Sequence, residues 1–153
     1  MTVITNLLIA IKNWFQDLTP IFVEESKVPV ILSYVAPLDI GAISIFPFVF
    51  SRYPKGELSE RTRRHETIHH QQTMELLIVG HVIVYLFDWI RGLIKYRNDW
   101  ENQDSPRGLS KYQSAGNKAY YRTRSEQEAY DNELDEDYLT IRKRYTWLFK
   151  YSV

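Results

Sequence analysis

Hydrophobic residues recur every three or four positions at the start of the chain. Val3, Leu7, Ile11 and Trp14 share one side of a helical wheel. The pattern predicts an amphipathic helix over residues 3–17, ended by the Thr-Pro pair that follows. We expect this helix to pack on the protein core, with a position on a membrane surface as the alternative.

The pattern changes over residues 20–50, where β-branched and aromatic runs alternate with proline and glycine. Such runs are typical of short strands separated by turns. We predict strands over 29–35 and 42–50, joined by a turn over 37–41. Proline cannot donate a ladder hydrogen bond, so the second strand is expected to be an edge strand or to end at Pro47.

Residues 60–97 carry one long helical pattern, polar in its first half and apolar in its second. Ser59 is the expected N-cap. The apolar part, 76–90, would rise about 22 Å, less than the thickness of a bilayer core. His81 and Asp88 also interrupt it. We expect a central helix buried in the protein, with membrane insertion as the alternative.

The polar stretch over 98–118 lacks a clear period and is predicted to be a loop. From about 120 to 149 the pattern is helical again, acidic before it is basic, as the helix dipole favours. The prediction for residues 1–153 is therefore a single domain of the α+β class, mainly α.

Composition limits the functions that this chain can have. Hydrophobic residues make up 44% and charged residues 25%, as in ordinary globular proteins. Nineteen basic residues balance nineteen acidic ones, which argues against a nucleic-acid partner. Without cysteine, any metal must be bound by histidine and carboxylate. No cleavable signal peptide is expected, so we predict a cytoplasmic or membrane-associated protein.

The strongest chemical motif is His65-Glu66-x-x-His69. Residues four apart lie on one face of a helix, so His65 and His69 can bind one metal ion through their imidazoles. Glu66 lies about 100° around the same turn, outside the ligand set but close enough to take a proton from a metal-bound water. This pattern favours a catalytic zinc site, with one ion, over two surface histidines.

A catalytic zinc needs a third protein ligand. The extended motif that supplies a third histidine has a glycine where this chain has Gln72, and histidine where it has Glu75. His81 lies at the wrong helical angle, and His70 points about 100° away from His69, which suits packing or support of a ligand. Di-iron sites are excluded by counting, because the chain has only four histidines and a single Glu-x-x-His element.

The sequence Glu126-Gln127-Glu128-Ala129-Tyr130 provides the resemblance that completes the site. With His65-Glu66-x-x-His69 it resembles the gluzincin-like zinc metallopeptidases, which take a glutamate as third ligand. Within that group, membrane metallopeptidases of the prenyl-protein-processing and heat-shock type place this glutamate in a Glu-x-x-Ala-Asp pattern. Matching the alanine assigns Glu126 as the metal ligand, with Glu128 as the alternative. Tyr130 stands where those families have aspartate, so Asp131 or Glu133 would have to support a histidine instead.

The two motifs together also look like small uncharacterised zincin-like proteins of bacteria or phages. That resemblance covers about half of the chain. It implies a minimal zincin-like fold with a long active-site helix, a short strand pair before it and a C-terminal glutamate helix. It also implies that the edge strand over 42–50 aligns an extended substrate.

The expected activity is zinc-dependent hydrolysis of a peptide bond in a peptide or protein substrate. Zinc would lower the pKa of its bound water, and Glu66 would act as general base. An oxyanion donor is also required. The candidates lie beside the glutamate helix: Tyr120, Tyr121, Arg122 and Arg124. The alternative is a catalytically silent zincin-like protein, associated with a membrane and active in binding or assembly.

Overall fold

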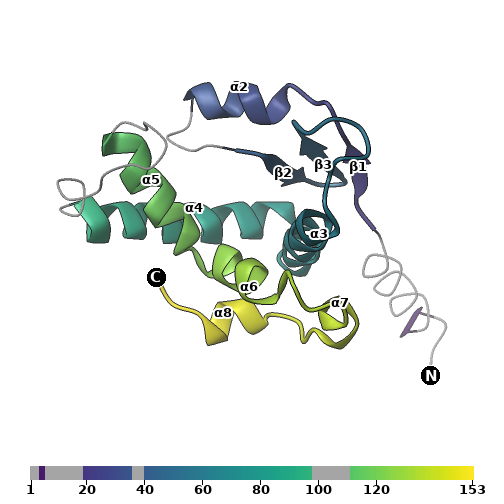
Figure 1. Ribbon diagram of the computed structural model, residues 1–153. Helices are drawn as coiled ribbons and strands as arrows, with labels where there is room; N and C mark the ends of the chain where they lie inside the picture. The colour runs from purple at the N-terminus through teal and green to yellow at the C-terminus, as the bar shows by residue number, and fades with distance from the viewer. Residues whose placement is uncertain (1–3, 6–18, 36–39, 98–110) are drawn as a thin grey trace.

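A computed structural model describes residues 4–5, 19–35, 40–97 and 111–153 of the chain. Its helices and strands follow in the order β1 (Ile21–Val23), α2 (Val28–Val35), β2 (Ala42–Ile45), β3 (Phe48–Ser51), α3 (Glu60–Glu75), α4 (Leu77–Tyr96), α5 (Lys111–Tyr121), α6 (Arg124–Asn132), α7 (Tyr138–Ile141) and α8 (Thr146–Lys150). The α+β class, mainly α, is confirmed. Figure 1 shows the sheet between α2 on one side and the α3–α4 pair on the other.

Three short strands form the sheet in the order β1-β3-β2. β1 runs parallel to β3, with Phe22 opposite Val49, and β2 runs antiparallel to β3, with Ile43 opposite Phe50. Val49 at the centre is fully buried. The predicted strand over 42–50 is thus a hairpin that turns at Phe46-Pro47, as the proline indicated, and β2 is an edge strand.

The predicted strand over 29–35 is wrong, because these residues lie in helix α2. Ser26 accepts a hydrogen bond from the Val28 backbone N–H through its side-chain oxygen (3.2 Å), which caps the start of the helix. Pro29 lies in the first turn, where proline is tolerated. The strand that does pair with the hairpin is β1, upstream of the predicted one.

Helix α3 begins where expected. The Ser59 side chain accepts a hydrogen bond from the Thr62 N–H (3.1 Å), as an N-cap does. The single helix predicted over 60–97, however, is interrupted at Leu76, and Leu77 has a positive φ of 50°. In Figure 1, α3 is seen nearly end-on while α4 runs across the view, so the chain turns sharply between them.

The predicted burial of 76–90 is also wrong. Of the residues in α4, only Asp88 and Gly92 are buried. Gly92 lies so close to α5 that a Cβ there would be 3.0 Å from the Cα of Ala119. Most large apolar side chains of α4 are exposed instead. Within the described residues, α4 is the one helix with the length and apolar composition needed to cross a membrane.

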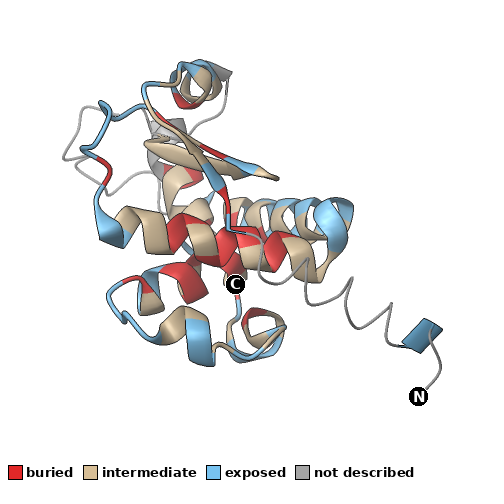
Figure 2. Ribbon diagram, turned by 90° about the vertical axis from the view of Figure 1, so that its right-hand side faces the viewer, coloured by how far each residue is buried: buried red, intermediate tan, exposed pale blue. Residues whose placement is uncertain are grey.

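The C-terminal third is more broken than predicted. Residues 111–118, expected in a loop, belong to α5, and the helix predicted over 120–149 is divided into α6, α7 and α8. Trp147 on α8 is fully buried, and Figure 2 shows buried residues gathered at the centre of the molecule. The predictions for most of 3–17, most of the turn over 37–41, and 98–110 lie outside the described residues.

Candidate metal centre

Helices α3 and α6 bring three buried side chains together. His65 and His69 lie one turn apart on α3, and their Nε2 atoms are 3.1 Å apart. Glu126 on α6 places Oε2 3.3 Å from His65 Nε2 and Oε1 3.0 Å from His69 Nε2. Ligands of a tetrahedral zinc at 2.0–2.1 Å are separated by about 3.3 Å. The three residues therefore form a group that could hold a metal ion.

Glu133 orients the His65 ring. Its Oε2 lies 2.9 Å from His65 Nδ1, and its other oxygen accepts a hydrogen bond from Arg61 Nε (2.7 Å). An ionised carboxylate can only accept, so Nδ1 carries the proton and the Nε2 lone pair faces the cluster. The edge of the His65 ring also meets Tyr130, with centroids 4.6 Å apart. Of the two supports predicted, the structure shows Glu133.

Gln72 does the same for His69. Its side-chain NH₂ donates to the Ser125 carbonyl (3.0 Å) and to Glu128 Oε2 (2.7 Å). The amide oxygen of Gln72 therefore faces His69 Nδ1, at 2.8 Å, and fixes the proton there. Both Nε2 lone pairs and a carboxylate then point at one place. This arrangement is repulsive without a cation, and so it fits a metal ion.

The charge on Glu126 couples the ligands to one another. Burial lowers the pKa of His69, but the adjacent Glu126 carboxylate outweighs it, and the pKa rises to about 9. Burial raises the pKa of Glu126, and the two imidazoles more than offset it, so that the pKa falls below its ordinary value. Without metal, this buried carboxylate therefore holds a proton on a histidine.

Glu66 lies beside the ligands without joining them. It is buried, and its Oε2 has no hydrogen-bond partner among the described residues. Burial raises the pKa of Glu66, although the neighbouring histidines lower it in part. A carboxylate with a raised pKa and a free oxygen is suited to accept a proton and release it again.

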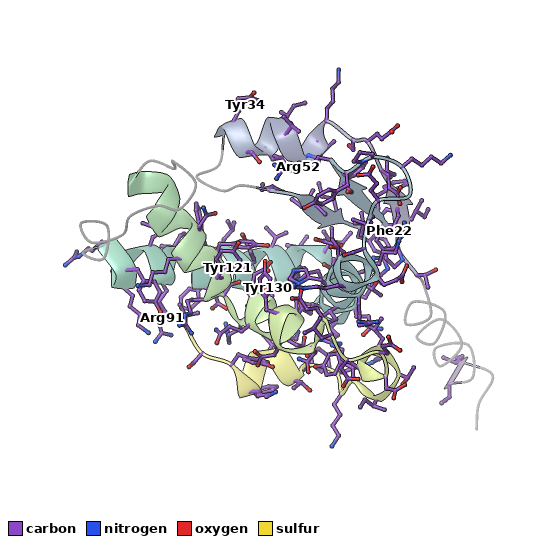
Figure 3. All side chains as sticks on the ribbon, in the orientation of Figure 1. Phe22, Tyr34, Arg52, Arg91, Tyr121 and Tyr130 are labelled. Atoms are coloured by element: carbon purple, nitrogen blue, oxygen red, sulfur yellow. The ribbon has the colours of Figure 1, made fainter. Side chains whose placement is uncertain are left out.

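A cavity of about 610 Å³ opens onto Glu66 and the three candidate metal ligands. β2 borders it along its whole length, and residues of α3, α4, α5 and α6 complete the wall. Five tyrosines line it: Tyr53, Tyr85, Tyr120, Tyr121 and Tyr130. Figure 3 shows Tyr121 and Tyr130 close together, with ring centroids 5.2 Å apart. Burial raises the pKa of Tyr120 well above 10, so its phenol stays protonated and can donate.

Several predicted site residues lie elsewhere. Glu128 accepts hydrogen bonds from Gln72, Arg142 Nη2 (2.8 Å) and the Tyr138 hydroxyl (2.8 Å), and is therefore engaged away from the ligands. Arg124 is paired with Asp88 through Nε at 2.8 Å, and neither it nor Arg122 borders the cavity. Among the oxyanion candidates, the structure brings only Tyr120 and Tyr121 to the cavity.

The other two histidines lie outside the group that could hold a metal ion. His70 stacks on Phe46 with centroids 5.2 Å apart, and His81 Nδ1 lies 2.9 Å from the Thr73 hydroxyl. The sequence prediction missed Gln72 and Tyr85. Gln72 lies three residues after His69, on the same helical face, so its spacing was a usable signal. Tyr85 had none, because its position depends on the turn between α3 and α4.

Comparison with known protein families, curated proteins and solved structures found no match to this chain. The site must therefore be judged on its own geometry.

Proposed function

We propose that the chain is a zinc-dependent metallohydrolase that cleaves peptide bonds. The observation that carries the proposal is the convergence of His65, His69 and Glu126, whose facing atoms lie 3.0–3.3 Å apart. Gln72 and Glu133 hold the two rings in the tautomer that ligation needs. An ion held by three protein ligands leaves a position for water, the feature that separates catalytic zinc sites from structural ones.

Glu66 is the proposed general base. Zinc, when bound, would supply a Lewis acid that activates water and polarises the substrate carbonyl. Glu66 accepts the proton of the attacking water and delivers it to the leaving nitrogen, a task for which a raised pKa is favourable. A protein that only bound zinc would not need a buried carboxylate with a free oxygen at this place.

Tyr120 is the proposed donor to the developing oxyanion. It borders the same cavity as Glu66, and its phenol stays protonated at neutral pH. Removing one such donor from a hydrolase typically lowers kcat by about 10²–10³-fold. Tyr120→Phe is therefore expected to lower kcat by that factor without changing zinc content. Tyr34→Phe, at an exposed tyrosine outside the cavity, serves as the control.

The edge strand β2 supports a peptide as substrate. Residues 40–46 all border the cavity, and within the described part of the chain β2 is paired with β3 on one side only. An extended peptide can add to such an edge through its main chain, which aligns a scissile bond without demanding a particular side chain.

Metal analysis combined with a peptidase assay tests the proposal. The wild-type protein should bind one zinc per chain and cleave quenched-fluorescence peptides. Glu66→Gln should keep the zinc and lose activity by at least about 10²-fold. Glu60→Gln, on the exposed first turn of the same helix, is the matched control.

Each contrary result has a definite meaning. A wild-type protein without stoichiometric zinc would overturn the metal site. If Glu128→Ala keeps its zinc and Glu126→Ala loses it, the ligand set is supported. If Glu126→Ala keeps its zinc and Glu128→Ala loses it, the ligand set is contradicted. Stoichiometric zinc without cleavage of any peptide would indicate the silent binding protein instead.

A further inference from the structure

The outer side of α4 is apolar and exposed. Six large side chains fall within about 100° of the helical wheel and are 44–70% exposed. They form what we call the α4 outer face: Val79, Ile83, Leu86, Phe87, Ile90 and Ile94. A contiguous apolar surface of this kind on a folded domain marks a site of contact with something other than water.

The inner side of the same helix carries two ionisable residues that contact other helices. Asp88 is buried and paired with Arg124, and His81 faces Thr73 on α3. The helix therefore turns Asp88 and His81 toward protein and most of its large apolar side chains toward the surroundings. This is the reverse of an ordinary surface helix, and it is the arrangement expected of a helix against lipid.

Charge at the end of α4 identifies the kind of lipid. Between residues 77 and 97 the only acidic residue is Asp88, which is buried in its ion pair. The exposed charges are all basic and lie in the last two turns: Arg91, Lys95 and Arg97. Figure 3 shows Arg91 on this C-terminal half of the helix. A basic end beside an apolar face complements anionic headgroups.

We propose that α4 docks in the plane of an anionic lipid bilayer through its outer face. The helix is long enough to cross a membrane, but α5 packs along its other side with Gly92 against Ala119, and α6 is tied to it through Arg124. These polar helices would have to enter the hydrocarbon with it. Docking in the plane leaves them in water.

Docking would also place the cavity beside the bilayer. Ile78 and Val82, two exposed apolar residues of α4, border the cavity as well. The lipid-facing side of α4 is therefore continuous with one wall of the cavity.

Vesicle sedimentation tests the proposal. The protein of residues 1–153 should sediment with vesicles of equal parts phosphatidylcholine and phosphatidylglycerol, and much less with phosphatidylcholine alone. The double variant Ile83→Asp with Phe87→Asp should weaken binding at least about a hundredfold, since both side chains would enter the lipid. Arg91→Glu with Lys95→Glu should weaken binding to the anionic vesicles by about twentyfold or more.

Matched controls use exposed residues outside the face. Phe149 on α8 is 86% exposed, so Phe149→Asp should bind like the wild type, and so should Lys143→Glu. Equal loss in these controls, or a wild-type protein that stays in the supernatant, overturns the proposal. Protein that stays with the vesicles in alkaline carbonate would indicate a spanning helix and would also overturn the proposal. So would a dimer in solution that Ile83→Asp dissociates, because a second copy would then cover the α4 outer face. Vesicle binding does not depend on catalysis, so Glu66→Gln should bind vesicles normally. The docking proposal and the proposed hydrolase activity can therefore fail separately.

Discussion

The two histidines of the site are held by acceptors of different charge. His65 donates to the carboxylate of Glu133, whereas His69 donates to the neutral amide of Gln72. A carboxylate acceptor makes the imidazole a stronger metal ligand and stabilises positive charge on the site. Glu133 should therefore contribute to metal affinity through His65, although it is not itself a candidate ligand.

We expect Glu133→Gln to weaken zinc binding by about 10–100-fold, because the ring of His65 loses its charged acceptor. Competition with a chelator measures this affinity. Glu133 also pairs with Arg61, so Arg61→Gln separates the two roles by breaking the ion pair and leaving the histidine bond. Glu136→Gln, an exposed neighbour with the same change of charge, is the second control. Similar losses in all three variants would contradict the proposed support.

The metal-free protein should lose stability toward unfolding as the pH rises. In the metal-free protein the pKa of His69 is about 9, above the ordinary value of about 6.5. A raised pKa stabilises the fold in full below pH 6.5, and that contribution is lost as the pH rises through 9. The loss should be roughly 3 kcal/mol of unfolding free energy.

Urea unfolding at pH 6, 7.5 and 9, with chelator or with zinc, measures this dependence. Zinc-loaded protein should not show the decline, since ligation needs the neutral histidine. Glu126→Gln without zinc should flatten the curve, because the carboxylate that raises the pKa is gone. A metal-free wild-type protein that is equally stable at pH 6 and pH 9 would argue against the coupling.

At the scale of residues, the sequence predicted the site where spacing along one helix decides geometry. His65, Glu66 and His69 needed only the helical period. Choosing Glu126 over Glu128 depended on a family pattern, and the structure gives the physical reason. Two residues along a helix point about 160° apart, so Glu128 meets Arg142 and Tyr138 instead.

At the scale of elements, the turn between α3 and α4 sets the shape of the cavity. Leu77 adopts a positive φ of 50° there, which costs a residue with a Cβ about 1–2 kcal/mol. Its side chain is 75% exposed, so little packing offsets this cost.

Leu77→Gly should therefore leave the protein as stable or stabilise it by up to about 1 kcal/mol, measured by chemical unfolding. Ile83→Gly, at an exposed position inside the helix, should cost about 1 kcal/mol. Leu77→Val should be the worst of the three, because a β-branched residue tolerates a positive φ least. A glycine at 77 as costly as one at 83 would show that strain is not present at the turn.

Helices and strands were harder to predict than the site, because tertiary contacts override the local sequence pattern in two of them. Residues 28–35 are rich in valine and isoleucine, yet the Ser26 cap and Pro29 start a helix there. The apolar run of α4 was expected inside the protein, because a protein in water usually buries such a run in its core. Its exposure could be found only from the fold, which buries Asp88 and turns the opposite side outward.

At the scale of the whole molecule, a buried ion network fastens the C-terminal part to the site helix. Arg142 pairs with Glu75 on α3 and with Glu128 on α6. Glu75 also accepts from the indole N–H of Trp147 (2.9 Å) and the backbone N–H of Tyr145 (3.0 Å). Because Glu128 accepts from Gln72 as well, the same network reaches the residue that orients His69.

Arg142→Met should lower the free energy of unfolding by about 3–5 kcal/mol, because it leaves two buried carboxylates without their charged partner. Denaturant unfolding in excess chelator measures this cost without a contribution from zinc. Lys143→Met removes the same charge from an exposed neighbour and should change stability by less than about 0.5 kcal/mol. Adding Glu75→Gln to Arg142→Met should recover part of the loss, since one unpaired charge is then neutral. If the Arg142 and Lys143 variants were equally stable, the network would contribute no more than a surface charge.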